Sequence, residues 1–495
     1  MQLAPLAALC ALALLPAPAR TQDSSILTQK PIQELRGAWI TPSDGVFASQ
    51  ASIAKAMEAL ADARFNVVFP CVWDGANTLW HSPTAKEAFG ADCDPAYGER
   101  DVMSEILFEA HRHGLEVVPW FEAGFTAKGA LLDKHPEWAA IDKDGKPLVK
   151  DGARWVDALQ PEAQQFFLSL VLEVARNFDV DGIAGSERFP ALPAEAAAKP
   201  AQRELYTKAA AGNSSTDPKD PKWRAWRAQQ LTEFLGRISG GLRPSLAIVL
   251  APHAPSAADW MQDYGGWCEH NYAHALVLPA AQVSTDAWCG KHMEKLFAAV
   301  EASSASKAVV AAHRTQKLAG EVFSSCKALL EKDAALAVAL ADEPYGLPAI
   351  PPWRKEEGWR PKPIEAHPQA GSGRWTFPDS NGPMVMKLDG ASSGEASWSA
   401  RAHVAGNYDV YTWIPPDQNL GEIAKYQLAN KHGLITKQVR VGPLTCRGWR
   451  YVGTVELPEG EDFEVARFDA IEKDASKASA IGPLILLYDH MSNRP

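Results

Sequence analysis

Residues 178–193 (Phe-Asp-Val-Asp-Gly-Ile-Ala-Gly-Ser-Glu-Arg-Phe-Pro-Ala-Leu-Pro) constrain the fold more than any other stretch of this chain. An amphipathic helix is predicted over 161–177, and it leads into a short apolar strand at 180–183. The strand ends in a polar tip, Ser186-Glu187-Arg188. A helix, a buried strand and then charged side chains are typical of a (β/α) barrel, which builds its active site at the carboxyl ends of its strands.

The same alternation of strand and helix extends over residues 35–350. Helices are predicted at 49–63, 100–113, 161–177 and 223–239. Eight strands are predicted, at 36–40, 66–73, 115–121, 180–183, 246–250, 275–278, 308–311 and 336–340. We therefore predict an α/β fold over 35–350, a (β/α)8 TIM-type barrel with long inserted loops.

The composition changes beyond this region. Residues 351–383 are rich in proline and glycine, which predicts a linker. From 384 to 490 the helical period gives way to short alternating segments, which predict an all-β sandwich domain. A chain of 495 residues is long enough for two such domains.

The first 19 residues contain an apolar run that ends in Ala17-Pro18-Ala19, which resembles a signal-peptidase site. We expect a signal peptide over 1–19 and a secreted or periplasmic protein, the alternative being a buried N-terminal helix. No later apolar run approaches the roughly 20 residues of a membrane-spanning helix, so we expect none in the mature protein. The net charge of −11 argues against nucleic acid as a partner.

Cleavage after residue 19 would remove Cys10 and leave six of the seven cysteines. Export permits disulfides, and Cys71–Cys93 and Cys268–Cys289 are the local pairs to consider; isolated buried thiols are the alternative. The chain has no C-x-x-C or H-E-x-x-H spacing, so neither a metal nor another cofactor is expected.

Acidic side chains follow several of the predicted strands. Glycoside hydrolysis needs two carboxyl groups across the scissile bond, and aromatic rings provide flat faces for sugars. The candidate catalytic residues are Glu122, Glu187 and Glu343. Candidates for substrate binding near the same strand ends are Trp39, Asp74, Asn77, Arg188 and His253.

Structural roles compete with these functional ones. Asp181, at the start of the fourth strand, is expected to fix the Gly182 backbone rather than to act in chemistry. Glu122 could instead form a structural ion pair with Arg188. In the C-terminal region, Trp413 and Trp449 are expected in the core rather than as sugar platforms.

The barrel region resembles the glycosyl hydrolase-like ten family of secreted bacterial proteins. The resemblance rests on motifs spread over about residues 35–347: Glu34-Leu-Arg-Gly-Ala-Trp-Ile-Thr41, Asn66-Val-Val-Phe-Pro-Cys-Val-Trp73, Gly98-Glu-Arg-Asp-Val-Met103, 109–125, His135-Pro-Glu-Trp138 and Phe178-Asp-Val-Asp-Gly-Ile183. It implies a TIM-type barrel that acts on glycans.

Departures from the family pattern fall on the functional strand ends. Family members usually carry a pair of aspartates where this chain has Ser186 and Glu187. The sequence therefore favours an exported, glycoside-hydrolase-like protein that acts on a cell-wall or extracellular glycan by acid/base carboxylate chemistry. The alternative is a catalytically impaired pseudoenzyme that binds the glycan without turnover.

The C-terminal region resembles the golvesin/Xly carbohydrate-binding-like β-sandwich. The residues that carry this resemblance are Ala405-Gly-Asn-Tyr-Asp-Val-Tyr-Thr-Trp413, Ala424-Lys-Tyr-Gln-Leu428 and Gly448-Trp-Arg-Tyr-Val-Gly-Thr454. The resemblance implies a module that binds polysaccharide or packs on its barrel.

Overall fold

The structure is a computed structural model. It describes residues 32–210, 215–254, 256–283, 292–354, 360–377, 383–388, 393–415, 420–421, 423–430, 433–440, 448–470 and 477–493. The expected signal peptide lies outside these residues. Within them, no helix combines the length and hydrophobicity needed to cross a bilayer.

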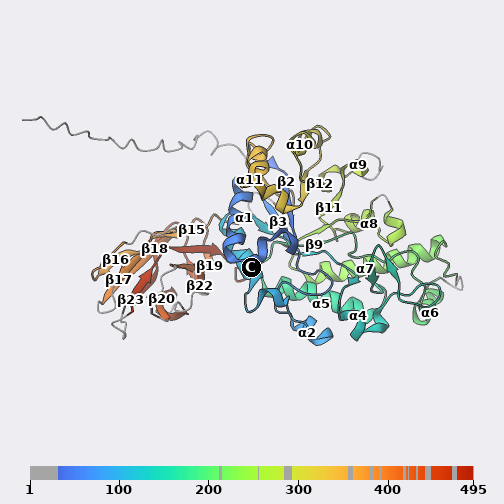
Figure 1. Cartoon of the computed structure of the whole chain (residues 1–495), viewed down its shortest axis with the longest axis horizontal. Coiled ribbons are helices and arrows are strands. Elements are labelled where there is room, and N and C mark those ends of the chain that lie inside the picture. The colour runs from blue at the N-terminus through green and yellow to red at the C-terminus, as the bar shows by residue number, and fades with distance from the viewer. Residues whose placement is uncertain are drawn as a thin grey trace, which may run out of the picture.

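Nine strands of the described residues form one parallel sheet in the order β4-β3-β2-β13-β12-β11-β10-β9-β5 (Figure 1). Their bounds are β2 (Leu35–Ile40), β3 (Val67–Pro70), β4 (Glu116–Val117), β5 (Trp120–Phe121), β9 (Gly182–Gly185), β10 (Ala247–Leu250), β11 (Ala275–Pro279), β12 (Leu296–Glu301) and β13 (Gly320–Ser324).

The two strands at the ends of this order, β4 and β5, belong to one chain segment that is interrupted at Pro119. On one side, the Val118 N–H donates to the Val68 carbonyl at 3.0 Å. On the other, the Ala184 N–H donates to the Pro119 carbonyl at 2.8 Å. This arrangement is consistent with a TIM-like barrel.

Helices flank the sheet. They are α1 (Gln50–Asp62), α2 (Pro83–Phe89), α3 (Val102–Arg112), α4 (Leu131–Lys134), α5 (Pro161–Asn177), α6 (Pro200–Ala209), α7 (Pro221–Gly241), α8 (Tyr264–Glu269), α9 (Ala280–Val283), α10 (Ser306–Thr315) and α11 (Cys326–Asp342). Helix α5 illustrates why these segments are helical and pack on the sheet. Pro161 occupies its first turn, where no N–H is needed for an intrahelical hydrogen bond, and residues such as Phe167, Leu170 and Val174 form a buried apolar face.

Two of the predicted strands are wrong. Residues 308–311 lie within α10, and 336–340 lie within α11. The last two strands of the sheet are β12 and β13 instead. Short apolar runs have no period of their own, so they fit the buried face of a helix as well as a strand.

The side chains that point to the inside of the parallel sheet form one apolar cluster. It draws members from β2, β3, β9, β10, β11, β12 and β13 and from the segment containing β4 and β5: Leu35, Trp39, Val67, Phe69, Val118, Ala184, Ala247, Val249, Ala275, Val277, Phe297 and Val322. Trp353, from the predicted linker, packs against this cluster, with its ring 6.2 Å from that of Phe297.

The C-terminal strands form antiparallel sheets. Their orders are β15-β25-β19-β22, β16-β18-β23-β20-β21 and β17-β24. The bounds are β15 (Ile364–Ala366), β16 (Gln369–Ser372), β17 (Met386–Leu388), β18 (Gly394–Arg401), β19 (Gly406–Ile414), β20 (Ile423–Asn430), β21 (Gly433–Arg440), β22 (Gly448–Leu457), β23 (Asp462–Ala470), β24 (Ser479–Ile481) and β25 (Leu484–Tyr488). The sheets share one apolar core that includes Trp398, Tyr426 and Leu486. Residues 364–493 are referred to below as the β-module.

The segment predicted as a linker is partly ordered structure. It supplies β15 and β16, which pair with β25 and β18 of the β-module. Before β15, Arg354 and Arg360 contact the parallel-sheet region. The Arg354 guanidinium pairs with Glu116, and its Nη2 donates to the Asp181 carbonyl at 2.9 Å.

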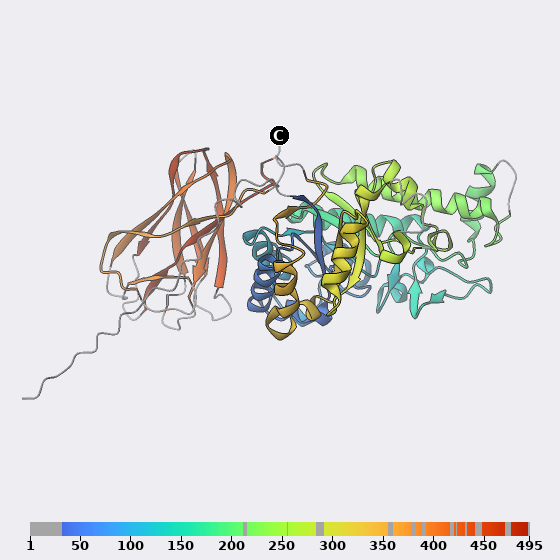
Figure 2. The same cartoon turned by 90° about the horizontal axis from the view of Figure 1, so that it is seen from above.

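The β-module lies beside the parallel-sheet region, next to the flanking helix α1 (Figures 1 and 2). Phe108 of α3 packs into an apolar cluster with Trp449, Ile485 and Leu487 of the β-module. Trp449 is buried and Trp413 packs against this cluster, so both side chains serve packing, as the sequence predicts.

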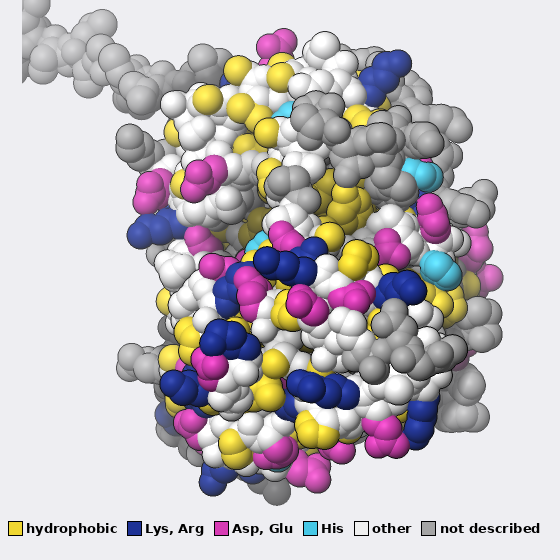
Figure 3. All heavy atoms as spheres, turned by 90° about the vertical axis from the view of Figure 1, so that its right-hand side faces the viewer, with side chains coloured by type: hydrophobic (Ala, Val, Ile, Leu, Met, Phe, Trp, Pro, Cys, Tyr) yellow, Lys and Arg dark blue, Asp and Glu magenta, His cyan; other side chains and the backbone are white. Residues whose placement is uncertain are grey.

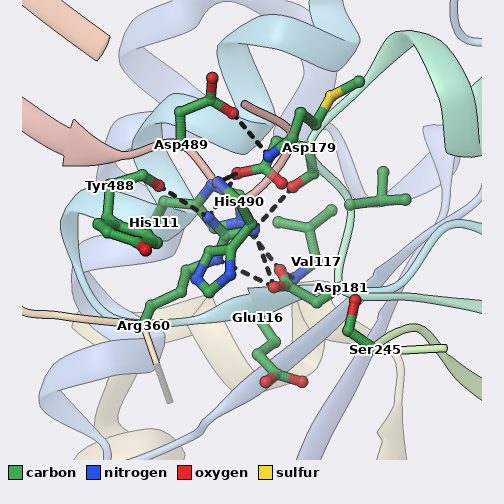
Figure 4. A network of polar contacts seen from close by, with 12 residues as sticks. His111, Glu116, Val117, Asp179, Asp181, Ser245, Arg360, Tyr488, Asp489 and His490 are labelled. Atoms are coloured by element: carbon green, nitrogen blue, oxygen red, sulfur yellow. Dashed lines mark hydrogen bonds and ion pairs between the residues drawn. The ribbon is translucent and has the colours of Figure 1, made fainter. Parts of the chain in front are cut away.

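Arg360 lies at the centre of the polar contacts beside this cluster (Figure 4). Its Nη1 donates to Asp179 Oδ2 at 2.6 Å and its Nε to Asp181 Oδ1 at 2.9 Å. Burial raises the pKa of both carboxyl groups, but the charge of Arg360 and its hydrogen bonds, together with the nearby His111, outweigh burial, and the pKa of each is lowered. Asp181 also accepts from the Val117 N–H at 2.8 Å and lies 2.9 Å from His111 Nε2, so its role is structural, but the backbone that its side chain fixes is that of Val117 and not that of Gly182.

The predicted Cys71–Cys93 disulfide is not formed, because both residues are buried free thiols. Cys289, of the second predicted pair, lies outside the described residues.

We predict that Arg360→Met lowers the free energy of unfolding by about 3–5 kcal/mol, since it removes the buried guanidinium that pairs with both Asp179 and Asp181. Urea unfolding followed by tryptophan fluorescence measures the effect. Arg374→Met is the matched control, because Arg374 is exposed, and it should change stability by less than about 0.5 kcal/mol. Equal unfolding midpoints for the two variants would contradict the assigned role of Arg360.

Candidate active site

Loops at the carboxyl ends of β3, β5, β9 and β10 carry most of the predicted site residues. Asp74 follows β3, Glu122 follows β5, Glu187 and Arg188 follow β9, and His253 follows β10. The strands β5, β9 and β10 are adjacent in the sheet, and a bridge between Cys71 and Trp120 joins the end of β3 to β5. These residues therefore share one end of the sheet, termed the mouth below.

Glu122 is the partly buried acid of the mouth. Burial raises the pKa of its carboxyl group, and the nearby charges of Glu187 and Asp74 raise it further. Lys128 and Arg188 act in the opposite direction without cancelling the shift. Glu122 thus lies close enough to four charged side chains to be influenced by each, and its carboxyl group keeps its proton to higher pH than that of a free glutamate.

The loop after β5 lies directly against the loop after β9. The Phe125 N–H donates to the Arg188 carbonyl at 2.9 Å. Gly124 makes this approach available: its φ is +49°, and a Cβ at this position would lie 2.2 Å from the Arg188 oxygen. Only glycine combines a positive φ with the absence of a Cβ, and both are required at position 124.

Glu187 is more open to solvent than Glu122. Its side chain is 42% exposed, and Oε1 lies 3.5 Å from Arg188 Nε. The ion pair of Arg188 is thus with Glu187, and Arg188 reaches Glu122 only through its charge. The Glu187 carbonyl accepts from Gln262 Nε2 at 3.0 Å, which fixes the loop after β9 to the loop after β10.

Ser186, which stands in the place of a family aspartate, has a backbone role. The side chain is buried, and its hydroxyl oxygen accepts from the Arg188 N–H at 3.0 Å. The hydroxyl therefore shapes the turn that presents Glu187.

His253 lies at the other side of the mouth. Its ring stacks on Trp260 with centroids 3.9 Å apart, and Lys150 Nζ lies 4.2 Å from the centre of the same Trp260 ring. Burial lowers the pKa of His253 to about 4, with Arg188 and Lys150 acting in the same direction against Asp151. A neutral imidazole at pH 7 can exchange hydrogen bonds with hydroxyl groups but carries no charge.

The predicted aromatic residues separate into two groups. Trp39 is 7% exposed, belongs to the inner cluster and lies with its ring 4.4 Å from that of Trp120, which is partly exposed. Both belong to the strands that lead into the mouth. Trp73 is fully buried in the outer core, where its Nε1 donates to the Gly124 carbonyl at 3.2 Å, so it supports the loop without facing a ligand.

Asp74 and Asn77 form a turn after β3. Asp74 Oδ1 accepts the N–H groups of Ala76 and Asn77, each at 2.8 Å. Asn77 is held in this turn through its backbone N–H, and the side chains of Asp74 and Asn77 remain partly exposed.

Glu343 does not share the mouth. It caps the carboxyl end of α11 and is exposed. With Lys307 and Arg314 it lines a separate cavity that also includes Ile32, a residue that precedes β2. The prediction that Glu343 follows the last strand is wrong because 336–340 is helical, and the helix carries Glu343 to the opposite end of the sheet.

Several residues of the mouth were not among the predicted site residues: Lys128, Lys150, Asp151, Trp260 and Gln262. Lys128, Lys150 and Asp151 belong to the long excursion after β5, which forms the three-stranded sheet β6 (Thr126–Ala127), β8 (Ala153–Trp155) and β7 (Val149–Lys150). The sequence predicts long loops between the strands. It does not indicate which side chains of the loop after β5 lie near the carboxyl ends of the strands.

The face on which α4, α6 and α7 lie in Figure 1 is shown in Figure 3. It is hollowed near its middle, with hydrophobic side chains in the depth and side chains of both charges along the rim.

The family model described as Glycosyl hydrolase-like 10 matches residues 34–308. No curated protein matches the sequence.

Among solved structures, the chain is similar to several proteins over about 62% of its length. The glycoside hydrolase domain of PgaB (BpsB) from Bordetella bronchiseptica has a TM-score of 0.48 and 12% identity, over 62% of this chain and 98% of that chain. Alpha-L-fucosidase isoenzyme 2 from Paenibacillus thiaminolyticus has a TM-score of 0.45 and 14% identity, over 62% of this chain and 49% of that chain. The catalytic domain of the beta-amylase from Paenibacillus polymyxa has a TM-score of 0.44 and 12% identity, over 62% of this chain and 95% of that chain.

We predict that Gly124→Ala destabilises the protein by several kcal/mol more than Gly145→Ala. Both glycines have positive φ, +49° and +76°, so both variants carry the strain of roughly 1–2 kcal/mol for a left-handed residue. Only at Gly124 would the new Cβ meet backbone, because nothing lies within 4 Å of the position at Gly145. Thermal unfolding of the two variants measures the difference, and similar shifts would argue against the close packing of the two loops.

Proposed function

The chain belongs to the glycosyl hydrolase-like 10 family, whose model covers more than half of it, and we propose that it hydrolyses a cell-wall or extracellular glycan. The observation that carries the proposal is the pair of glutamates at the mouth in unlike surroundings. One is partly buried with a raised pKa, and the other is more exposed and paired with an arginine. Glycoside hydrolysis needs two carboxyl groups in different protonation states.

We assign Glu122 as the general acid. Its raised pKa favours the protonated carboxyl group that must give a proton to the departing sugar oxygen. Glu187 then acts as the carboxylate, either as nucleophile or as the base that activates water. Its exposure leaves it open to the substrate, and Arg188 at 3.5 Å stabilises its charge.

The other groups of the mouth are proposed to hold the sugar. Arg188 and Asp74 can bond to hydroxyl groups, and neutral His253 can do so without adding charge. Trp39 and Trp120 provide apolar surface beneath them. The parallel sheet is proposed to close as a complete barrel through the segment of β4 and β5, which hydrogen-bonds to both neighbours.

Two further proposals concern the parts around the barrel. Residues 1–19 are proposed to direct export, because their apolar run ends in an Ala-x-Ala pattern. The β-module is proposed to be a golvesin-like carbohydrate-binding module. Its antiparallel sheets around one apolar core support this assignment.

A second candidate function is glycan binding without turnover. Ser186 favours it, because its hydroxyl is committed to the Arg188 N–H and supplies no carboxylate. In that case the mouth would bind a glycan that it does not cleave.

Hydrolysis is tested by release of reducing ends from a panel of cell-wall and extracellular polysaccharides. With the responsive polysaccharide, Glu122→Gln and Glu187→Gln should each lower the rate by about 10²–10⁴-fold. Wild-type activity should fall as pH rises through the raised pKa of Glu122, because the donor then loses its proton. This high-pH decline should be absent from the residual activity of Glu122→Gln.

Glu343→Gln is the matched control, since this glutamate lies at the other end of the sheet, and its rate should stay within about twofold of wild type. Full activity in Glu187→Gln would remove the assigned carboxylate. Binding of a polysaccharide in calorimetry with no products at high protein concentration would favour the second function.

A further inference from the structure

A cavity of about 370 Å³ lies between the β-module and the parallel-sheet region. Its walls come from α3, from the end of α5 and from β19, β22 and β25. The volume falls in the range of roughly 300–1,000 Å³ that is typical of small-molecule sites, which also occur preferentially between domains. The cavity lies at the opposite end of the parallel sheet from the mouth, because Asp179 in its wall precedes β9.

Aromatic rings form one side of this cavity. Tyr411 lies on Phe108 with ring centroids 4.3 Å apart, and Tyr451 meets Tyr411 edge to face at 5.6 Å. Tyr451 is 53% exposed, so this wall is open to solvent and a ligand can enter. Such faces suit a sugar ring and, through their π-electrons, a cation.

Polar groups in the cavity retain unused hydrogen-bonding capacity. The Tyr411 hydroxyl has no hydrogen-bond partner among the described residues, although Asp409, Asp179 and Asp489 all lie close enough to raise its pKa. Asp409 accepts from the Thr454 hydroxyl through Oδ1 at 2.8 Å, and the Tyr451 hydroxyl, which lies 2.9 Å from that of Thr454, also bonds to the Asp409 carboxylate. The Tyr411 hydroxyl is therefore available to a polar ligand or to water.

The charges of the wall are of one sign. Three aspartates line the cavity, Asp179, Asp409 and Asp489, and no lysine or arginine is among its described lining residues. Arg360 neutralises Asp179 from outside the cavity. Burial raises the pKa of Asp409 to about 6, helped by the charges of Asp489 and Asp179 and opposed by Thr454 and Arg360.

The geometry selects against a metal ion. Among the described residues, no three His, Cys, Asp or Glu side chains converge closely enough to hold one. A larger cation that spreads its contacts over carboxylates and rings suits the cavity better.

We propose that this cavity binds a saccharide unit that carries a protonated amine. The ammonium group lies at Asp409 and Asp489, the sugar ring lies against Tyr411 and Tyr451, and the Tyr411 hydroxyl bonds to a sugar hydroxyl. This site is independent of the mouth and requires no turnover.

Calorimetry of the full chain with glucosamine tests the proposal, with N-acetylglucosamine as the neutral probe of similar shape. Glucosamine should bind at pH 7 with at least about tenfold lower Kd than N-acetylglucosamine, because the acetylated nitrogen carries no charge. Asp409→Asn should weaken glucosamine binding about tenfold, and Tyr411→Phe should weaken it less. Asp62→Asn, an exposed change on α1, is the matched control and should leave the Kd unchanged.

The pH dependence provides a readout that does not depend on any variant folding. Because the pKa of Asp409 is about 6, its carboxyl group is mostly neutral at pH 5, and glucosamine should bind about tenfold more weakly there than at pH 7. Glu187→Gln should bind glucosamine as the wild type does, which separates this site from the mouth. Equal affinity for the two sugars, no binding of glucosamine at all, or an unchanged Kd at pH 5 and in Asp409→Asn would each overturn the proposal.

Discussion

The buried contact between Asp181 and Arg360 is the interaction on which the arrangement of the whole chain depends. Asp181 accepts from the Val117 N–H and contacts His111, so it joins the start of β9 to β4 and α3. Arg360 extends the same network to Asp179 and to the Tyr488 carbonyl of the β-module (Figure 4). Neither charge could remain buried alone at acceptable cost, so each requires the other. The two regions of the chain are therefore joined by a paired charge as well as by the apolar cluster around Phe108.

This network separates the acidic residues of one short motif into two functions. Asp179 and Asp181 precede β9 and are consumed by structural pairing, whereas Glu187 follows β9 and remains open. The four residues of β9 separate the two aspartates from Glu187 and place them at opposite ends of the sheet. The same polarity explains why Glu122 belongs with Glu187 and why Glu343 does not. In a parallel sheet, position relative to the strand decides which carboxyl groups can share a substrate.

Sequence patterns predicted the elements with a clear period and failed where the period was ambiguous. The amphipathic pattern of 161–177 matches α5, and the first six strands lie close to their predicted places. The alanine-rich runs at 308–311 and 336–340 are helical. Because 336–340 was predicted as a strand, Glu343 was expected at the mouth, whereas it lies at the opposite end of the sheet. Contacts made across long loops, such as Lys150 on Trp260, leave no local signal, because they depend on how a loop folds back. The pairing of Arg360 with Asp179 and Asp181 could not be predicted either, because it also joins residues far apart in the sequence. Arg360 lies in a segment whose composition indicated only a linker.

The central claim is that the pKa of the Glu122 carboxyl group is raised by burial and by the neighbouring charge of Glu187. The most direct measurement is the titration of the Glu122 carboxyl carbon by NMR, with the resonance assigned by its loss in Glu122→Gln. The account predicts a pKa above the usual value for glutamate, and a decrease of that pKa in Glu187→Gln, because removal of the neighbouring negative charge favours ionisation. A Glu122 that titrates at or below the usual value, or that does not respond to Glu187→Gln, would contradict it.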